Sequence, residues 1–359
     1  MGAGLVSARN RLLAADLDDA PTGRACEQVV EAFREVTRFA AAAVMTVDPE
    51  TLLPSGGVVE GFTREDCAPF WENELLDPDF NKFAALARSI DPVATLADAV
   101  DGDLLRSPRY AKLYAATGAA DELRVAFVSG STCFGVGVFV RASQDGPFPR
   151  SELAEVRSLI PAATSALRRT LGRIFPDAAD QAPVVIILDG QGNVTGMSAG
   201  GQQALDELRL DGVDSDVPGV IQIAATKARS SRATTHVTTR VRGRSGRWVR
   251  LDVSPMEGQA GAVALTVETA ASHEIVGILL DSYGLTPRET DIVLRLCRGQ
   301  AIKEIADGLI ISAHTVRDHI KAIYRKANVN SRGELVAKLF SNHVLDRFHD
   351  SVAHVAQAS

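Results

Sequence analysis

The feature that most constrains this chain is a charged amphipathic segment near its C-terminus, residues 313–327. At about 100° per residue, the aliphatic side chains of this segment fall on one side of a helix. The opposite side is mostly cationic and carries His314, Arg317, Asp318, Lys321 and Arg325. Such a helix seats its aliphatic face on neighbouring elements and turns its cationic face to solvent or to a polyanion. An ordinary surface helix has the same pattern, so the flanking sequence must decide between the two.

The sequence before this segment predicts two short helices. Thr286-Pro287-Arg288-Glu289 forms a capping box with proline at the first helical position, so we expect a helix from Pro287 to about Gly299. A second helix is expected over Ile302–Leu309. The turn between these two helices is very short, which brings them close together in space.

Two further caps complete the pattern. Ser312 predicts the start of a third helix that runs to about Ala327, and Ser331 with Glu334 predicts the start of a fourth. Four short helices with turns this tight fit a helix-turn-helix unit, whose third helix can enter the major groove of DNA. The cationic face of residues 313–327 therefore becomes a candidate DNA-reading surface.

The distribution of charge supports this interpretation. The whole chain of 359 residues carries a net charge of −7, which taken alone argues against nucleic-acid binding. Residues 284–340, however, hold ten Lys and Arg against six Asp and Glu, which gives +4 and leaves −11 for the rest. This asymmetry is typical of an acidic regulatory body joined to a DNA-contacting module, although unrelated domains can also differ this much.

These C-terminal residues resemble the LuxR/GerE-type DNA-binding domain of bacterial transcription regulators. The likeness covers some 55 residues and many fixed positions. They are Leu285-Thr286-Pro287-Arg288-Glu289, Gly299, Lys303-Glu304-Ile305-Ala306, Leu309, Ile311-Ser312, Thr315-Val316-Arg317-x-His319, Ile323-Tyr324-x-Lys326 and Ser331-Arg332-x-Glu334-Leu335. Two positions depart from the family pattern: Ala301 stands where a hydroxyl cap is usual, and Gly308 lies in the last turn of the second helix.

The resemblance implies a role for each matching residue. Arg317, Asp318 and Lys321 would occupy the base-reading positions, while Lys303, Thr315 and His319 would approach phosphates or brace the helix. The predicted DNA-contacting set is therefore Lys303, His314, Thr315, Val316, Arg317, Asp318, His319, Lys321 and Arg325. Arg317 can donate in a fork to guanine, and Asp318 can accept from a cytosine amine. Alternatively, Asp318 forms a salt bridge to Lys321 or His314 within the helix.

Two α+β segments precede this domain. The first, 22–175, reads as helix, strands, helix, hairpin and closing helix, and its order resembles a GAF domain. The second, 183–270, resembles a PAS domain, and we expect a mixed five-stranded sheet there with helices on one face. Both folds can enclose a small molecule, so the resemblance implies sensing. Aromatic residues of the first segment could line a pocket or form ordinary core: Phe62, Phe70, Trp71, Phe80 and Phe83.

Other regulator and enzyme classes fit less well. The front segments hold no phosphoacceptor set of a receiver domain, no GxxxxGK[ST] loop and no likeness to an acyl-homoserine-lactone domain. Gly196-Met197-Ser198-Ala199-Gly200 matches the GxSxG nucleophile elbow, and His236 lies downstream. The elbow needs a parallel sheet, which so short a segment of meandering strands cannot supply. A serine hydrolase using Ser198 and a protein-binding adaptor that has lost DNA affinity stay as alternatives.

Composition sets the remaining expectations. The apolar runs, such as Phe39–Met45 and Val184–Leu188, are far shorter than the roughly 20 residues of a membrane span. The four cysteines are far apart, and all seven histidines lie at or after His236, so we expect no metal site and no cofactor. We expect a cytoplasmic, non-enzymatic regulator with no catalytic residues and no membrane contact.

The sequence thus predicts a multidomain α+β protein. We expect an N-terminal helical lead (1–21), a GAF-like domain (22–175), a PAS-like domain (183–270), a helical linker (271–284), an all-α four-helix DNA-binding domain (285–345) and a tail (346–359). The expected partners are double-stranded DNA, a second copy of the chain in a homodimer, and a small-molecule effector.

Overall fold

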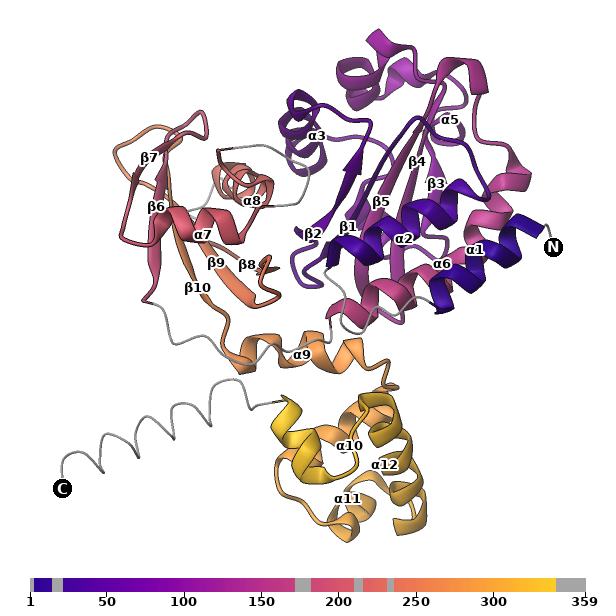
Figure 1. Ribbon diagram of the computed structural model, residues 1–359, viewed down its shortest axis with the longest axis vertical. Helices are drawn as coiled ribbons and strands as arrows, with labels where there is room; N and C mark the ends of the chain where they lie inside the picture. The colour runs from indigo at the N-terminus through magenta and orange to yellow at the C-terminus, as the bar shows by residue number, and fades with distance from the viewer. Residues whose placement is uncertain (1–2, 15–21, 172–181, 210–215, 231–235, 340–359) are drawn as a thin grey trace. The chain divides into compact units, whose positions relative to one another are not determined.

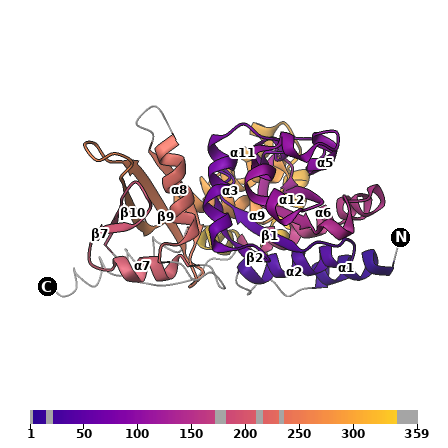
Figure 2. The same cartoon turned by 90° about the horizontal axis from the view of Figure 1, so that it is seen from above.

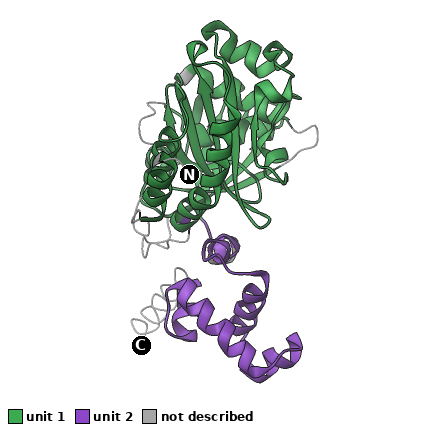
Figure 3. Cartoon of the chain, turned by 90° about the vertical axis from the view of Figure 1, so that its right-hand side faces the viewer, with its two compact units in different colours: residues 1–170, 180–269 green, residues 171–179, 270–359 purple. Residues whose placement is uncertain are grey.

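The computed structural model describes residues 3–14, 22–171, 182–209, 216–230 and 236–339. These residues fall into two compact units (Figure 3). One comprises residues 1–170 and 180–269, and the other comprises residues 171–179 and 270–359. The expected tail, 346–359, lies outside the described residues, as does most of the segment between 175 and 183.

The first unit begins with a five-stranded antiparallel sheet in the order β2-β1-β5-β4-β3 (Figure 1). Its strands are β1 (Ala41–Val47), β2 (Pro54–Glu60), β3 (Val93–Thr95), β4 (Asp121–Ser129) and β5 (Thr132–Arg141). Every residue of β1 is buried, because helices cover both faces of the sheet. Ala42 and Val44 face one apolar core, while Ala43 and Met45 face another.

Helices α1 (Ala3–Ala14), α2 (Thr22–Arg34) and α6 (Arg150–Leu171) supply the first of these cores. The expected N-terminal lead is therefore a part of this domain, since Leu5, Ala8 and Leu12 of α1 are buried against it. The other face is covered by several short elements, where the sequence predicted a single helix between the strands and the hairpin. They are α3 (Arg64–Leu76), α4 (Phe83–Leu86), α5 (Leu96–Ala99) and the short turns η1 (Leu104–Arg106), η2 (Tyr110–Tyr114) and η3 (Ala115–Thr117). A further short turn, η4 (Ser143–Asp145), follows β5.

The second sheet repeats the strand order of the first, as β7-β6-β10-β9-β8. Its strands are β6 (Val184–Leu188), β7 (Val194–Met197), β8 (Val237–Arg242), β9 (Trp248–Pro255) and β10 (Val263–Thr269), with helices α7 (Gly201–Glu207) and α8 (Gly219–Ser230). The prediction of a mixed sheet was wrong, because each of its described pairings is antiparallel. Alternating apolar residues indicate strands, but they do not give the direction of the neighbouring strand.

The two sheet domains share an apolar core within this unit. Figures 1 and 2 both show α8 lying beside α3, and side chains of the two helices belong to one cluster. A buried ion pair adds to this contact, because Arg240 of β8 donates to the carboxylate of Asp48, directly after β1, at 2.9 Å. The predicted multidomain α+β architecture is confirmed.

The second unit is helical. Helix α9 (Ser272–Ser282) coincides with the expected linker, and α10 (Pro287–Cys297), α11 (Ile302–Leu309) and α12 (Ala313–Ala327) follow. Residues 332–339 are also helical. The predicted bounds of α11 and α12 are confirmed. Ser312 caps the start of α12, whereas α11 begins at its predicted residue without a hydroxyl cap. Within the described ranges, the structure contains no helix that is both long and apolar enough to span a bilayer.

Candidate nucleic-acid interface

Helix α10 is fixed at its start by the expected capping box. Thr286 Oγ1 accepts a hydrogen bond from the Glu289 backbone N–H at 3.2 Å, and the Glu289 carboxylate accepts from the Thr286 N–H at 2.7 Å. The same carboxylate binds Lys326 Nζ of α12 at 2.6 Å. Burial alone would raise the pKa of Glu289, but the hydrogen bonds from Lys326 and Thr286 outweigh it and lower that pKa. Glu289 therefore ties α10 to α12 as an anion.

The two departures from the family pattern are Ala301, at the start of α11, and Gly308, in its last turn. Ala301 is the N-cap of α11 and makes no side-chain cap hydrogen bond, but Glu304 accepts from the Ala301 N–H at 2.7 Å. One half of a capping box is therefore kept. After α11, Ile310 adopts the left-handed conformation with φ of 57° and is 92% exposed. This left-handed conformation is strained for a β-branched residue.

Helix α12 buries and exposes the two faces that its helical period predicted. Its N-cap, Ser312, accepts from the Thr315 N–H at 3.0 Å. Val316, Ile323 and Ala327 are buried along one side. The opposite side is exposed over about three turns and carries the following predicted contact residues: His314, Thr315, Arg317, Asp318, Lys321 and Arg325. Side chains from one helix face thus form a row suited to a single groove of DNA.

Three other members of the predicted set lie differently. Lys303 is exposed, but on α11. His319 is half-buried. Val316 was wrongly placed among the DNA-contacting residues, because its side chain is 0% exposed and lies on the buried side of α12. A position in the middle of a recognition segment was mistaken for a surface position, although its aliphatic side chain already belonged to the apolar stripe.

Asp318 makes both of the salt bridges that were considered for it. His314 Nδ1 lies 2.9 Å from one carboxylate oxygen, and Lys321 Nζ lies 3.8 Å from the other. All three side chains are more than half exposed, so these ion pairs contribute little to stability. Both bridges can therefore open at little cost when DNA competes for the cations.

Two arginines to which the sequence gave no predicted role connect the helices of this unit. Arg288 Nη2 donates to the Leu309 carbonyl at 2.5 Å, which joins the start of α10 to the end of α11. Arg332 donates to the Leu296 carbonyl at 2.6 Å and to the Gln300 carbonyl at 3.2 Å. These side chains satisfy carbonyls at helix ends, where the helix leaves them without partners. Their only signal in the sequence was their place within the matched motifs.

The predicted ligand-lining aromatic residues of the front unit do not all line one pocket. Phe62, Phe70 and Trp71 line a small pocket of about 50 Å³. Phe83 is outside that lining but lies next to Phe70, with ring centroids 6.4 Å apart, and both rings pack on the buried Arg124. Phe80 is half-buried beneath Arg106, at 5.6 Å. The positions of aromatic residues in the sequence do not show which of them line the pocket and which pack on an arginine.

The region around Arg124 is a charged cluster that the sequence analysis missed. Arg109 and Arg124 are both 0% exposed. Arg109 Nη2 lies 2.5 Å from the Glu122 carboxylate, and Arg124 Nη1 lies 2.6 Å from that of Glu74. Burial alone would raise the pKa of Glu122, but the two guanidiniums lower it, so the cluster is a set of ion pairs. Glu122 and Arg124 are neighbours on one strand, but Arg109 and Glu74 come from distant segments, so no local pattern predicted the cluster.

The hydrolase alternative gains no support at Ser198. Its hydroxyl accepts from the Val185 N–H at 2.9 Å, as a residue of a sheet edge does. The sheet around it is antiparallel in its described pairings, whereas a nucleophile elbow sits on a parallel sheet. His236 contacts Ser254, Thr238 and Asp252 of its own hairpin. Among the described residues, no group of His, Cys, Asp and Glu could hold a metal ion.

The capped helices, the short turn and the exposed cationic face of α12 define a helix-turn-helix DNA-binding protein. Residues 283–339 match the family of bacterial regulatory proteins called the luxR family (GerE). The nitrate/nitrite response regulator protein NarP of Escherichia coli is 30% identical over 200 residues, which cover 52% of this chain and 87% of that protein. The chain belongs to the luxR family of bacterial regulatory proteins and is a DNA-binding transcriptional regulator.

Two further likenesses are more limited. The probable transcriptional regulatory protein NarL of Mycobacterium tuberculosis is 34% identical over 62 residues, 17% of this chain and 29% of that protein. A solved GAF domain/HD domain protein from Geobacter sulfurreducens is 20% identical, covers 44% of this chain and 95% of that chain, and has a TM-score of 0.31. That value is too low to bear on function, and the GAF-like and PAS-like readings of the front domains stay predictions.

Proposed function

We propose that α12 reads a specific operator through Arg317 and Lys321, and that an effector bound to the front domains changes the affinity of the chain for this operator. The observation that carries the proposal is the exposed row of cationic side chains on α12, held over buried Val316, Ile323 and Ala327. We expect Arg317 to donate in a fork to guanine in the major groove, because its side chain is exposed on this face. Lys303 on α11 is exposed and suited to a phosphate.

The direct test compares two alanine variants on operator and random DNA. Arg317→Ala should weaken binding to the operator by about 1 to 3 kcal/mol and relax its sequence preference. Lys303→Ala should weaken binding to all sequences alike and reduce the slope of log affinity against log salt by about one. An equal loss on operator and random DNA for Arg317→Ala contradicts the base-reading role. An absence of any retardation at low salt favours the adaptor alternative.

We further propose that the chain binds DNA as a homodimer through its fourth helix, Arg332 to Phe340, of which the structure describes residues 332–339. The resemblance to the luxR family implies this dimer contact. In this segment Leu335 and Leu339 are buried, while Gly333, Glu334 and Ala337 remain exposed. A two-fold symmetric dimer requires a two-fold symmetric operator. Analytical ultracentrifugation should find a dimer on DNA, and a monomer both on and off DNA would overturn the proposal.

A further inference from the structure

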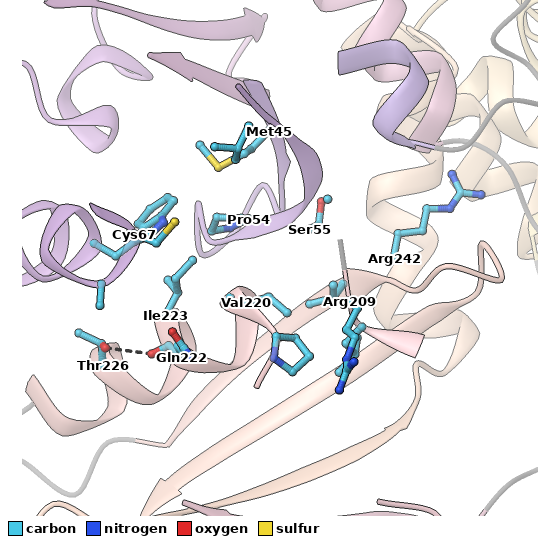
Figure 4. Close-up of a pocket in the computed structure, with 18 residues that line it drawn as sticks. Met45, Pro54, Ser55, Cys67, Arg209, Val220, Gln222, Ile223, Thr226 and Arg242 are labelled. Carbon is cyan, nitrogen blue, oxygen red and sulfur yellow. Dashed lines mark hydrogen bonds between the residues drawn. The ribbon is translucent and has the colours of Figure 1, made fainter. Parts of the chain in front are cut away.

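A pocket of about 90 Å³ lies between the two sheet domains of the first unit (Figure 4). One wall comes from β1, β2 and α3 and includes Met45, Pro54 and Trp71. The other wall comes from α8 and β8 and includes Ile223 and Val241. In Figure 4, Ile223 points from α8 toward Met45 and Pro54. This interdomain pocket is therefore made jointly by two domains, and neither domain completes it alone.

The contact that encloses the interdomain pocket is anchored by buried polar groups. The Asp48 carboxylate is 0% exposed and accepts from the backbone N–H of Arg240 at 2.8 Å as well as from its guanidinium. Thr51 and Thr239 share a hydrogen bond at 3.1 Å, and Lys227 Nζ of α8 donates to the Thr51 carbonyl at 3.2 Å. These contacts join the end of β1 to α8 and β8, so they hold the two walls together.

The charged side chains at the edge of the interdomain pocket are directed elsewhere. The described residues that line it include no Asp or Glu, and Figure 4 shows Arg209 and Arg242 pointing away from each other. Because Val241 faces the pocket, the next side chain of β8, Arg242, projects from the opposite face of the strand and donates to the Gly246 carbonyl at 3.0 Å. Arg209 Nε lies 3.5 Å from the Asp206 carboxylate. Both guanidiniums therefore have partners outside the pocket.

The hydroxyl and amide side chains of the lining also have hydrogen-bond partners. The Ser55 hydroxyl shares a hydrogen bond with that of Thr46 at 2.9 Å. Thr226 Oγ1 donates to the Gln222 carbonyl at 2.9 Å, as Figure 4 shows, and Gln222 Nε2 donates to the Val217 carbonyl at 3.3 Å. A charged ligand would lose its hydration here without gaining a partner, whereas an apolar ligand has no such cost. The lining therefore selects against charge.

The interdomain pocket adjoins the pocket of about 50 Å³ in the first sheet domain. Four residues line both of them: Met45, Val59, Cys67 and Trp71. Together the two pockets approach the roughly 150 Å³ of an apolar cavity that binds benzene. Met45 is unbranched and adapts its shape easily, so a small movement of this side chain lets one ligand reach both pockets.

We infer that the interdomain pocket binds an uncharged, apolar molecule about the size of one aromatic ring. The ligand packs against Met45, Trp71 and Ile223, and the burial of its apolar surface supplies the affinity. Because the ligand touches both domains, its binding stabilises the contact between them. The inference rests on the proposed function in one respect, since it names the chemical class of the effector.

The test is NMR of the whole chain with ¹³C-labelled methionine methyl groups, titrated with benzene and with toluene. At least one of the two should shift the Met45 signal saturably, whereas the signals of Met197 and Met256, which line neither pocket, should stay in place. Benzoate and benzylammonium are the matched charged probes. They should bind at least about tenfold more weakly, because either charge would be buried without a partner. An unresponsive Met45 signal, or equal binding of a charged probe, would overturn the inference.

Variants assign the binding to this pocket. Ile223→Phe should weaken the binding of benzene and toluene at least about tenfold, because the larger side chain fills the pocket. Ile187→Phe is the matched control, since Ile187 is half-buried on β6 and lines neither pocket. This control should bind as the unaltered chain does. Unchanged binding in Ile223→Phe, or an equal loss in both variants, overturns the assignment. If Ile223→Phe does not fold, the Met45 response of the unaltered chain still decides.

The two proposals fail separately. Operator binding by the ligand-free chain tests the α12 proposal and does not depend on the interdomain pocket. Intact operator binding with no Met45 response to benzene or toluene overturns the pocket alone. A saturable Met45 response without any specific DNA binding overturns the proposed function and leaves the pocket standing.

Discussion

At the residue scale, Gly308 is a residue of low helix propensity inside a helix. Gly308 lies within α11, and a Cβ added there would meet Arg295 Nη1 at 2.8 Å, the far end of a flexible side chain. Alanine is therefore accommodated by a small movement of Arg295. Gly308→Ala should stabilise α11 by about 1 kcal/mol, because glycine is the costlier residue in a helix interior. Hydrogen exchange of the α11 amides should slow about fivefold, and faster exchange would contradict this account.

The turn residue Ile310 gives a second test at this scale. Its left-handed backbone costs roughly 1 to 2 kcal/mol for a β-branched residue, and its side chain is exposed. Asparagine tolerates this conformation and loses no buried contact. Ile310→Asn should therefore slow exchange of the neighbouring α11 amides without reducing operator affinity. A loss of protection in these amides would show that the isoleucine side chain itself stabilises the turn.

Asp318 tests how charge is balanced on α12. Its carboxylate neutralises part of the cationic row through His314 and Lys321. Asp318→Asn should strengthen binding to random DNA by about two- to fivefold, the range expected for exposed ion pairs. If Asp318 also accepts from a cytosine, the operator gains less than random DNA. Weaker binding to random DNA would contradict its role as a local counter-ion.

At the scale of elements, start signals in the sequence were informative but not sufficient. Helices α10 and α12 begin directly after Thr286 and Ser312, which cap them as predicted, whereas α11 begins after Ala301 without a side-chain cap. Helix α3 also has a start signal, because Asp66 accepts a hydrogen bond from the Thr63 N–H at 2.8 Å, but its apolar residues lie on no single face and it contains Pro69, so its sequence shows no helical period. The antiparallel pairing of β6 with β10 depends on chain direction, which side-chain alternation does not encode.

The contact between α10 and α12 is predicted to depend on pH. The pKa of Glu289 is lowered in the folded chain, so its stabilisation is complete above its ordinary value and is lost as pH falls through the lowered value. Glu289→Gln should cost about 1 to 3 kcal/mol at neutral pH and remove this acid dependence. Urea unfolding followed through the α10 amide signals by NMR measures both effects. An unchanged acid dependence in Glu289→Gln would contradict the role of this carboxylate.

At the scale of the molecule, residues far apart in sequence decide how the front domains meet. Asp48 and Arg240 are 192 residues apart, and no local pattern could have paired them. Removing one partner of a buried ion pair typically costs about 3 to 5 kcal/mol. Asp48→Asn should therefore separate the unfolding of the two sheet domains, which Trp71 and Trp248 report individually when the other is replaced by phenylalanine.

Glu50 offers the matched control for this prediction. It also binds Arg240, at 2.6 Å, but its side chain is 76% exposed. Glu50→Gln should leave the two transitions together, because an exposed ion pair contributes little. Coincident transitions in Asp48→Asn would show that the apolar contact of α3 with α8 suffices to couple the domains.

Sequence recognition by the exposed cationic face of α12 can be measured by affinity selection of genomic fragments, with the full-length chain compared with its Arg317→Ala variant. The unaltered chain should enrich fragments that share one two-fold symmetric element, and Arg317→Ala should lose this enrichment while retaining weak, salt-sensitive binding to all fragments. Enrichment of the same element by both chains, or of none by the unaltered chain, would contradict the account.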